Sequence, residues 1–227
     1  MISILDNSDR ARHVVLFFWV YLGIIVAATG ADCLQLWIIS KWEAGKEVNP
    51  TFRNIHYWLY LLLNLSISAT FVATIIVFIQ WFRRAYHNLQ RGGNYIMNSE
   101  SAALWHWFIP IANLFWPYKI MKEIWYETQG TYTSDLKSHG ILRVWWILFI
   151  ISNFRFEVQT NGKAENLIRN NIIDIARDII TIPAILVTIY VVKQAASFEE
   201  QYMQQQKIES LGTTVPVTED NREEEFY

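Results

Sequence analysis

The sequence of 227 residues has little charge, a single cysteine and few helix-breaking residues. Charged residues make up 18% of the chain, against about 25% in ordinary soluble domains. One cysteine excludes a disulfide framework and a metal site built from several thiolates. The formal net charge of −2 gives no sign of nucleic-acid binding. The nine glycines and five prolines argue against a fibrous or low-complexity protein.

The sequence also lacks the motifs of common enzymes. It contains no Gly-x-Ser-x-Gly, no His-Glu-x-x-His and no glycine-rich phosphate loop. A haem between membrane helices usually needs a pair of histidines on facing helices. The five histidines, however, lie outside the two longest apolar runs: His13, His56, His87, His106 and His139. We therefore expect a protein that is not an enzyme and has no catalytic residue, cofactor or metal.

Hydrophobic residues are abundant, at 52% of the chain, and their distribution indicates a membrane protein. Residues 14–39 contain one charge, Asp32, and residues 57–82 contain none. A spanning helix needs about 20 apolar residues, so both runs are long enough to cross a bilayer. Trp37 and Trp42 mark the end of the first run, and Arg83 and Arg84 follow the second. Aromatic belts backed by cations are typical of membrane interfaces.

The first apolar run has an alternative interpretation as a cleaved signal. Arg10 and Arg12 precede it, as basic residues precede a signal peptide. The apolar region of such a peptide is about 7–15 residues long, which is far shorter than this run. Cys33 also suggests a lipoprotein cleavage site, but Asp32 stands where a small neutral residue is expected. The sequence therefore favours a retained membrane helix.

Three further apolar segments can be assigned with the positive-inside rule. One possibility is that residues 141–156 and 174–194 cross the membrane and the Trp-rich stretch at 102–118 does not. The resulting four spans place twelve Lys and Arg residues on the cytoplasmic side and seven outside. If the stretch at 102–118 also crosses, five spans place nine inside and ten outside. The rule predicts four spans with both termini in the cytoplasm.

The stretch at 102–127 is predicted to form an interfacial or re-entrant element. Four of the eleven tryptophans lie between residues 105 and 125, and tryptophan with lysine is typical of a segment lying at the headgroups. Pro110 and Pro117 each remove a backbone donor. We therefore expect a broken element, with a kink followed by a helix from about Pro117.

A motif in this region resembles a family of bacterial multi-span membrane proteins, domain of unknown function 4328. The resemblance covers roughly residues 55–195 and rests on Arg84-Ala85-Tyr86-His87-Asn88-Leu89, Trp107-Phe108-Ile109-Pro110-Ile111-Ala112-Asn113-Leu114, Pro117-Tyr118-Lys119, Met121, Glu123-Ile124-Trp125, Trp145-Trp146 and Ser152-Asn153. Residues 99–102 depart from the family, whose members often have a proline and a tryptophan there. The resemblance implies a bacterial multi-span membrane protein and assigns no activity.

Two sets of residues are candidates for interaction. The family motif supplies a candidate interaction surface: Arg84, Tyr86, Asn88, Trp107, Pro110, Asn113, Pro117, Tyr118, Glu123 and Trp125. Basic residues near the cytoplasmic interface are candidates for binding lipid headgroups: Arg83, Arg84, Arg91, Lys119 and Lys122. We also expect Arg84 and Glu123 to tie the second span to the interfacial element.

The sequence thus predicts an all-α, polytopic membrane domain over residues 1–198. Its spans are expected at about 14–39, 57–82, 141–156 and 174–194, followed by a flexible acidic tail at 199–227. We expect an accessory or scaffold subunit of a complex in the bacterial cytoplasmic (inner) membrane, whose partners are the bilayer and other membrane subunits. A small transporter or channel component is the alternative, using Asn64, Asn153 and the group Asp174, Arg177 and Asp178. A haem or redox subunit is the third interpretation.

Overall fold

The described parts of the chain are helical and contain no strand, which confirms the all-α class. The computed structural model describes residues 4–93, 105, 107, 109–153 and 164–212. Their helices are α1 (Ser8–Glu43), α2 (Pro50–Arg91), α4 (Pro110–Asn113), α5 (Trp116–Gly130), α6 (Gly140–Asn153) and α7 (Ala164–Gly212). The helices α1, α2 and α7 are each long and apolar enough to cross a membrane. The predicted spans at 14–39, 57–82 and 174–194 lie within them.

The described part of the predicted third span, residues 141–153, forms a short helix. Helix α6 is apolar but has only 14 residues. At a rise of 1.5 Å per residue it is about 21 Å long, which is less than the hydrocarbon thickness of about 30 Å. Residues 154–156 of the proposed span lie outside the described residues.

Local signals in the sequence explain where several helices begin. The Asn49 side chain accepts hydrogen bonds from the backbone N–H groups of Thr51 and Phe52, and Pro50 follows it at the first position of α2. Asn49 therefore caps the helix. Proline is favourable at the first position, because a backbone N–H there would have no acceptor within the helix. Pro110 and Pro117 likewise stand at the starts of α4 and α5. The predicted break between the two prolines, and the helix from about Pro117, are confirmed.

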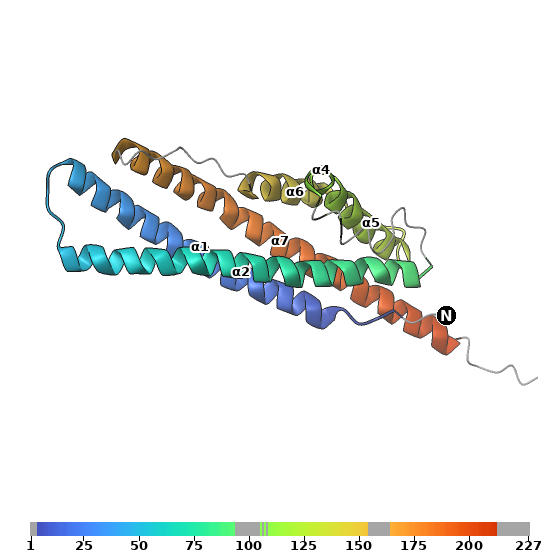
Figure 1. The fold of residues 1–227 in the computed structure, drawn as a ribbon. Helices are drawn as coiled ribbons and strands as arrows, with labels where there is room; N and C mark the ends of the chain where they lie inside the picture. The colour runs from blue at the N-terminus through green and yellow to red at the C-terminus, as the bar shows by residue number, and fades with distance from the viewer. Residues whose placement is uncertain (1–3, 94–104, 106, 108, 154–163, 213–227) are drawn as a thin grey trace, which may run out of the picture.

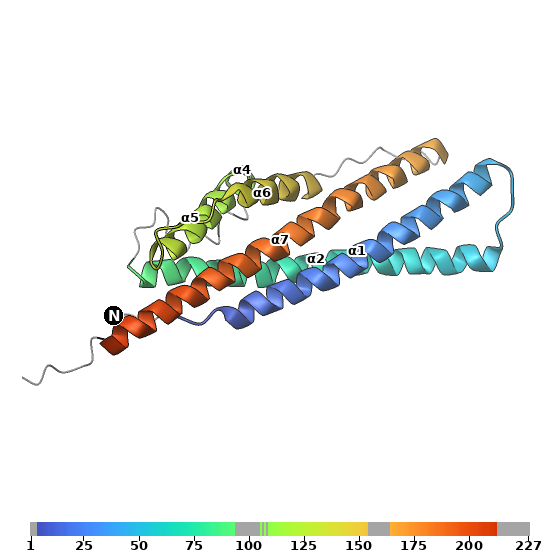
Figure 2. The same cartoon turned by 180° about the vertical axis from the view of Figure 1, so that it is seen from behind.

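The helices pack as an elongated bundle with two different ends (Figure 1). Helix α1 packs against both α2 and α7. We call the end where α1 begins and α2 and α7 finish the aromatic end, and the end where α1 turns into α2 the hairpin end. Helices α4, α5 and α6 lie toward the aromatic end, as Figure 2 shows from behind. The start of α1 and the end of α7 lie at the same end of the bundle.

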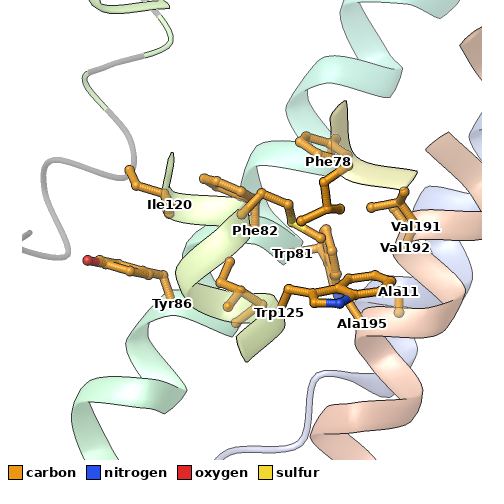
Figure 3. Packing of buried hydrophobic residues seen from close by; sticks show 14 of the residues in the cluster. Ala11, Phe78, Trp81, Phe82, Tyr86, Ile120, Trp125, Val191, Val192 and Ala195 are labelled. Atoms are coloured by element: carbon orange, nitrogen blue, oxygen red, sulfur yellow. The ribbon is translucent and has the colours of Figure 1, made fainter. Parts of the chain in front are cut away.

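The main core lies at the aromatic end. Side chains from α1, α2, α5 and α7 converge there (Figure 3), and α6 adds Trp145. Trp81, Trp125 and Trp145 are among the largest fully buried side chains. The Trp125 ring meets the Phe198 ring edge to face, with 4.9 Å between ring centroids. A second, smaller cluster of buried residues consists of Ile25, Ile185 and Ile189.

The end of α7 corrects the predicted boundary of the flexible tail. Helix α7 continues to Gly212, so residues 199–212 are helical. Glu199 and Tyr202 are each only 5% exposed, because this part of α7 packs beside the start of α1 and the end of α2. The expectation of a flexible segment is therefore wrong for residues 199–212. Residues 213–227 of the predicted tail lie outside the described residues.

Candidate functional site

Much of the family motif is buried inside the molecule rather than displayed on a surface. Tyr86, Asn88, Pro117 and Trp125 are all buried, so they hold helices of this chain together. The expectation of an interaction surface is wrong for these four residues. Trp107, Asn113, Tyr118 and Glu123 are half-buried, and the side chain of Pro110 lies outside the described ones.

Two hydrogen bonds show how the motif joins α2, α5 and the loop before α6. The Tyr86 hydroxyl of α2 donates to Glu123 Oε2 of α5 at 2.6 Å. Trp125 Nε1 donates to the carbonyl oxygen of Lys137 at 3.0 Å. A tie between α2 and the interfacial element is thus seen at Tyr86, two residues after the proposed partner Arg84. The pairing of Arg84 with Glu123 stays a prediction.

A buried carboxyl group links three helix ends at the aromatic end. Glu199 of α7 accepts hydrogen bonds from Asn7 Nδ2 and Asn88 Nδ2, each at 3.0 Å. Asn88 also donates to the Leu5 carbonyl at 2.9 Å and accepts from the Leu5 N–H at 3.1 Å, and Asn7 donates to the Trp81 carbonyl at 3.2 Å. These bonds fasten the start of the chain to α2 and α7.

The Glu199 carboxyl lies outside the apolar part of α7. It follows Lys193 and the charge-free run at 179–192, just as Asn7 and Asn88 lie outside the apolar runs of their segments. Burial raises the pKa of Glu199 to about 7, although its bonds from Asn7 and Asn88 act in the opposite direction. Desolvation disfavours the charged form of a carboxyl, so burial outweighs the two amide donors here.

Trp107 and Asn113 line a cavity of about 300 Å³ between α1, α2, α6 and α7. The Trp107 ring stands edge to face against Phe78 and Phe82, with 5.6 Å between centroids in both pairs. It meets the Phe149 ring of α6 in the same way at 6.0 Å. The motif therefore places one tryptophan inside the bundle, which the sequence had suggested for the interface.

The basic residues fall into two groups by exposure. Arg83, Lys119 and Lys122 are exposed, whereas Arg84 and Arg91 are half-buried. The Lys119 ammonium lies 4.9 Å from the centroid of the Trp116 ring, an arrangement in which the ring stabilises the cation. The exposed cations lie at the aromatic end, on α5 and the end of α2.

The charged group predicted on α7 forms ion pairs in the structure. Arg177 Nη1 lies 2.8 Å from Asp174 Oδ1, and Arg177 Nη2 lies 3.5 Å from Asp178 Oδ1. Thr29 of α1 donates to Asp178 Oδ2 at 3.1 Å. Asp174 and Arg177 are three residues apart, a spacing at which helical side chains can pair, but no sequence pattern indicates Thr29.

Asp32, the one charge in the first apolar run, lies in this polar cluster. It is 5% exposed, and Asn171 Nδ2 lies 3.4 Å from its Oδ1 atom. His56 of α2 is also buried and lies 3.0 Å from the carbonyl oxygen of Ala31. Asn171 was not predicted as part of a site, because its partner Asp32 is far away in the sequence.

The two asparagines named for the transporter or channel alternative bond within their own helices. Asn64 Nδ2 donates to the Tyr60 carbonyl at 2.9 Å, and Asn153 Nδ2 donates to the Phe149 carbonyl at 2.8 Å. Among the described residues, no three His, Cys, Asp or Glu side chains are grouped so that they could hold a metal ion.

Comparison with known proteins identifies the family. The sequence profile of the family described as Domain of unknown function (DUF4328) matches residues 45–197, which extend from the turn before α2 to the buried part of α7. No curated protein and no solved structure is significantly similar to the chain. The profile match covers more than half of the sequence, so the chain belongs to the DUF4328 family.

Proposed function

We propose that this protein is a non-enzymatic accessory or scaffold subunit of a complex in the bacterial cytoplasmic membrane. One observation carries the proposal: the part of α2 at the hairpin end has almost no cover from its own chain. Among residues 50–69 only His56 is buried. The same helix is well buried between Phe78 and Leu89, where α5 and the core pack against it.

The uncovered part of α2 has a composition suited to another helix. Ser66, Ser68 and Ala69 are exposed in the middle of its apolar run. Small residues let helix backbones approach closely in a membrane, where packing and polar contacts drive association. Ser66 and Ala69 lie on one face of α2, three residues apart. Ser66 donates to a carbonyl of its own helix, so it can lie against a neighbour without an unsatisfied group. A helix of a second membrane protein is the partner that fits this face.

A bulky substitution tests this face. We expect the protein, expressed at native level and extracted in mild detergent, to migrate with a stoichiometric second membrane protein. Ser66→Trp should release that protein, because the bulky indole keeps the partner helix from packing closely against α2. Ile179→Trp is the matched control, since Ile179 is an exposed residue on α7. A wild-type protein that migrates alone, or a Ser66→Trp variant that keeps its partner, would overturn the proposal.

We further propose four spans with both termini in the cytoplasm. The start of α1 and the end of α7 lie at one end of the bundle, as an even number of crossings requires. The exposed Arg83, Lys119 and Lys122 lie at that end too, and cytoplasmic surfaces are the ones enriched in Lys and Arg.

Cysteine labelling tests the topology. Cys33 is the only thiol, so Cys33→Ala gives a thiol-free host for single cysteines at two exposed loop positions, Lys46 and Ser134. An impermeant maleimide applied to cells with an opened outer envelope should label Lys46→Cys and spare Ser134→Cys. Permeabilised cells should label both. Labelling of Ser134→Cys in intact cells would place the loop after α5 outside and contradict four spans.

Anionic lipid headgroups are the second proposed partner. Each cation near an anionic surface contributes roughly 1 kcal/mol of binding free energy, and Arg83, Lys119 and Lys122 are exposed together at the aromatic end. The pairing of Lys119 with the Trp116 ring supports a position at the headgroups, where tryptophan is enriched.

The polar cluster at the hairpin end favours a second candidate, a small transporter or channel component. Asp32 and Asp178 are buried between α1 and α7, and ionisable groups within spans often mark ion or proton pathways. Protein reconstituted in vesicles loaded with a pH-sensitive dye would test it. Proton flux that Asp178→Asn abolishes would favour this candidate over the accessory subunit, and equal leakage with and without protein would eliminate proton transport.

A further inference from the structure

The cavity lined by Trp107 and Asn113 lies within the apolar part of the bundle. On one side it is lined by Phe71 and Phe78, from the charge-free run of α2. On the other it is lined by α7 residues between Thr181 and Thr188, from the run at 179–192. Its volume of about 300 Å³ is at the lower end of the range for small-molecule sites, about 300–1,000 Å³.

Two buried polar atoms at this cavity have no hydrogen-bond partner among the described residues. They are Trp107 Nε1, a donor, and Asn113 Oδ1, an acceptor. Leaving such a group unpaired in an apolar environment is unfavourable, and native proteins leave few of them unpaired. One unused donor and one unused acceptor beside the same cavity indicate a ligand group that can both accept and donate.

The rest of the lining selects a neutral, mostly apolar ligand. None of the side chains in the described part of the cavity lining is charged. Aromatic rings make up much of the wall, among them Phe18, Trp145 and Phe149. The hydroxyls of Thr74, Thr181 and Thr188 donate to carbonyls of their own helices, whereas Trp107 Nε1 is a buried donor without a partner in the parts of the chain that the structure describes.

We infer that this cavity binds a neutral membrane-soluble molecule through an alcoholic or phenolic hydroxyl group. The hydroxyl oxygen accepts from Trp107 Nε1 and its proton is donated to Asn113 Oδ1. A ring or the first part of a chain fills the aromatic cavity, because buried apolar area favours binding. The site does not depend on the proposed accessory role, since it lies inside the monomer.

A series of three probes in phosphatidylcholine nanodiscs tests the hydroxyl requirement. The probes are 4-hexylphenol, its methyl ether 4-hexylanisole, which cannot donate, and hexylbenzene, which can neither donate nor accept through oxygen. Saturable binding is followed by the shift in thermal unfolding temperature. We expect 4-hexylphenol to bind the wild-type protein about tenfold more tightly than the ether, which is a difference of about 1.4 kcal/mol, and hexylbenzene to bind most weakly. Equal binding of the three probes would overturn the inference.

Two variants assign the contacts. Asn113→Leu removes the acceptor, so it should abolish the preference for the phenol over the ether while leaving the binding of hexylbenzene unchanged. Trp107→Phe keeps a ring in the aromatic cluster and removes the N–H donor, so it should bring the ether and hexylbenzene to similar affinity. A preference that survives both substitutions would overturn the inference. The probe series on the wild-type protein remains decisive if either variant fails to fold.

A fourth probe separates the two sources of such a hydroxyl. If 1-decanol binds more tightly than 4-hexylphenol, the natural ligand has an aliphatic alcohol, as a glycerol-based lipid does. If the phenol binds more tightly, the ligand carries its hydroxyl on an aromatic ring. Binding of neither molecule would overturn the inference.

Discussion

The aromatic end and the hairpin end of the bundle are held together in different ways. At the aromatic end, α1, α2, α5, α6 and α7 contribute to one core that contains Trp81, Trp125 and Trp145. Toward the hairpin end, the smaller cluster has three buried residues, from α1 and α7: Ile25, Ile185 and Ile189. Ile67 of α2 is only partly buried against them. Stability should therefore be concentrated where the aromatic rings are, and the surface open to partners should be at the other end.

The polar contacts differ between the two ends as well. At the aromatic end a single buried carboxyl, Glu199, is bonded by two neutral amides. At the hairpin end three aspartates surround one arginine, with Arg177 bridging Asp174 and Asp178. The first arrangement fastens the start of the chain to two helices, whereas the second balances charges that lie along α7. Substitutions at both ends can measure this difference.

The largest expected effect is the loss of a core tryptophan. Trp125→Ala removes a fully buried ring together with its edge contact to Phe198 and its bond to the Lys137 carbonyl. Large-to-small changes of this kind lower the free energy of unfolding by about 3–5 kcal/mol. Trp58→Ala at the hairpin end is the control, because Trp58 is 55% exposed; we expect a change within about 0.5 kcal/mol.

Denaturant unfolding in mild detergent, followed by circular dichroism, measures both variants. Similar losses of stability for Trp125→Ala and Trp58→Ala would contradict the contrast between the two ends. A loss in Trp58→Ala that appears only when a partner protein is present would instead place the partner on that face of α2.

The second expected effect concerns the buried carboxyl at the aromatic end. Glu199→Leu removes one of the two acceptors of the Asn7 amide and one of the two acceptors of the Asn88 amide. Buried N–H groups left unpaired in this way should lower the free energy of unfolding by about 1–3 kcal/mol. Glu199→Gln keeps one acceptor oxygen and should lower it less. Glu200→Leu is the matched control, because Glu200 is the next residue in the chain and its side chain is exposed. Equal stability of Glu199→Leu and Glu200→Leu would show that these bonds do not fasten the chain start.

The same carboxyl should make stability depend on pH. Burial raises the pKa of Glu199 from its ordinary value of 4.5 to about 7. The folded protein therefore holds this proton more tightly than the unfolded chain between these values, and stability falls as pH rises from about 4.5 through 7. Unfolding midpoints between pH 5 and pH 8 should decrease in the wild-type protein. The decrease should be smaller in Glu199→Gln; an identical profile in the two proteins would assign it to other groups.

Local signals predicted the elements that depend on local chemistry. Charge-free runs gave the positions of the long apolar helices, and Pro117 gave the start of α5. The end of α7 was missed because the acidic composition after residue 199 suggested a solvated segment. The spacing of Val192, Ala195 and Tyr202 did carry a helical period, and all three are buried. Burial of Glu199 depends on Asn7 and Asn88, which no local pattern connects to it.

The residues of the candidate site were predicted from a local motif, but their position in a cavity was not. The family motif pointed to Trp107 and Asn113, but composition placed their segment at the membrane surface. The cavity forms only where α2, α6 and α7 meet around Trp107, and a pattern within one segment cannot show that enclosure. The pair of Asp174 with Arg177 follows from i, i+3 spacing on one helix, whereas the longer contact of Arg177 with its neighbour Asp178 does not.

The smallest expected effect tests the hairpin end. Thr29→Val removes a hydroxyl whose one proton is shared between Asp178 Oδ2 of α7 and the Ile25 carbonyl of its own helix. Hydrogen bonds between membrane helices contribute on average about 0.6 kcal/mol. Thr181→Val makes the same chemical change one turn from Asp178, where the hydroxyl bonds only to the Arg177 carbonyl in its own helix, and it should change stability less. Both are measured as shifts of the denaturant midpoint in detergent. A loss in Thr29→Val as large as that of Trp125→Ala would mean that the polar cluster, rather than the aromatic core, holds α1 to α7, and the contrast between the two ends would have to be reversed.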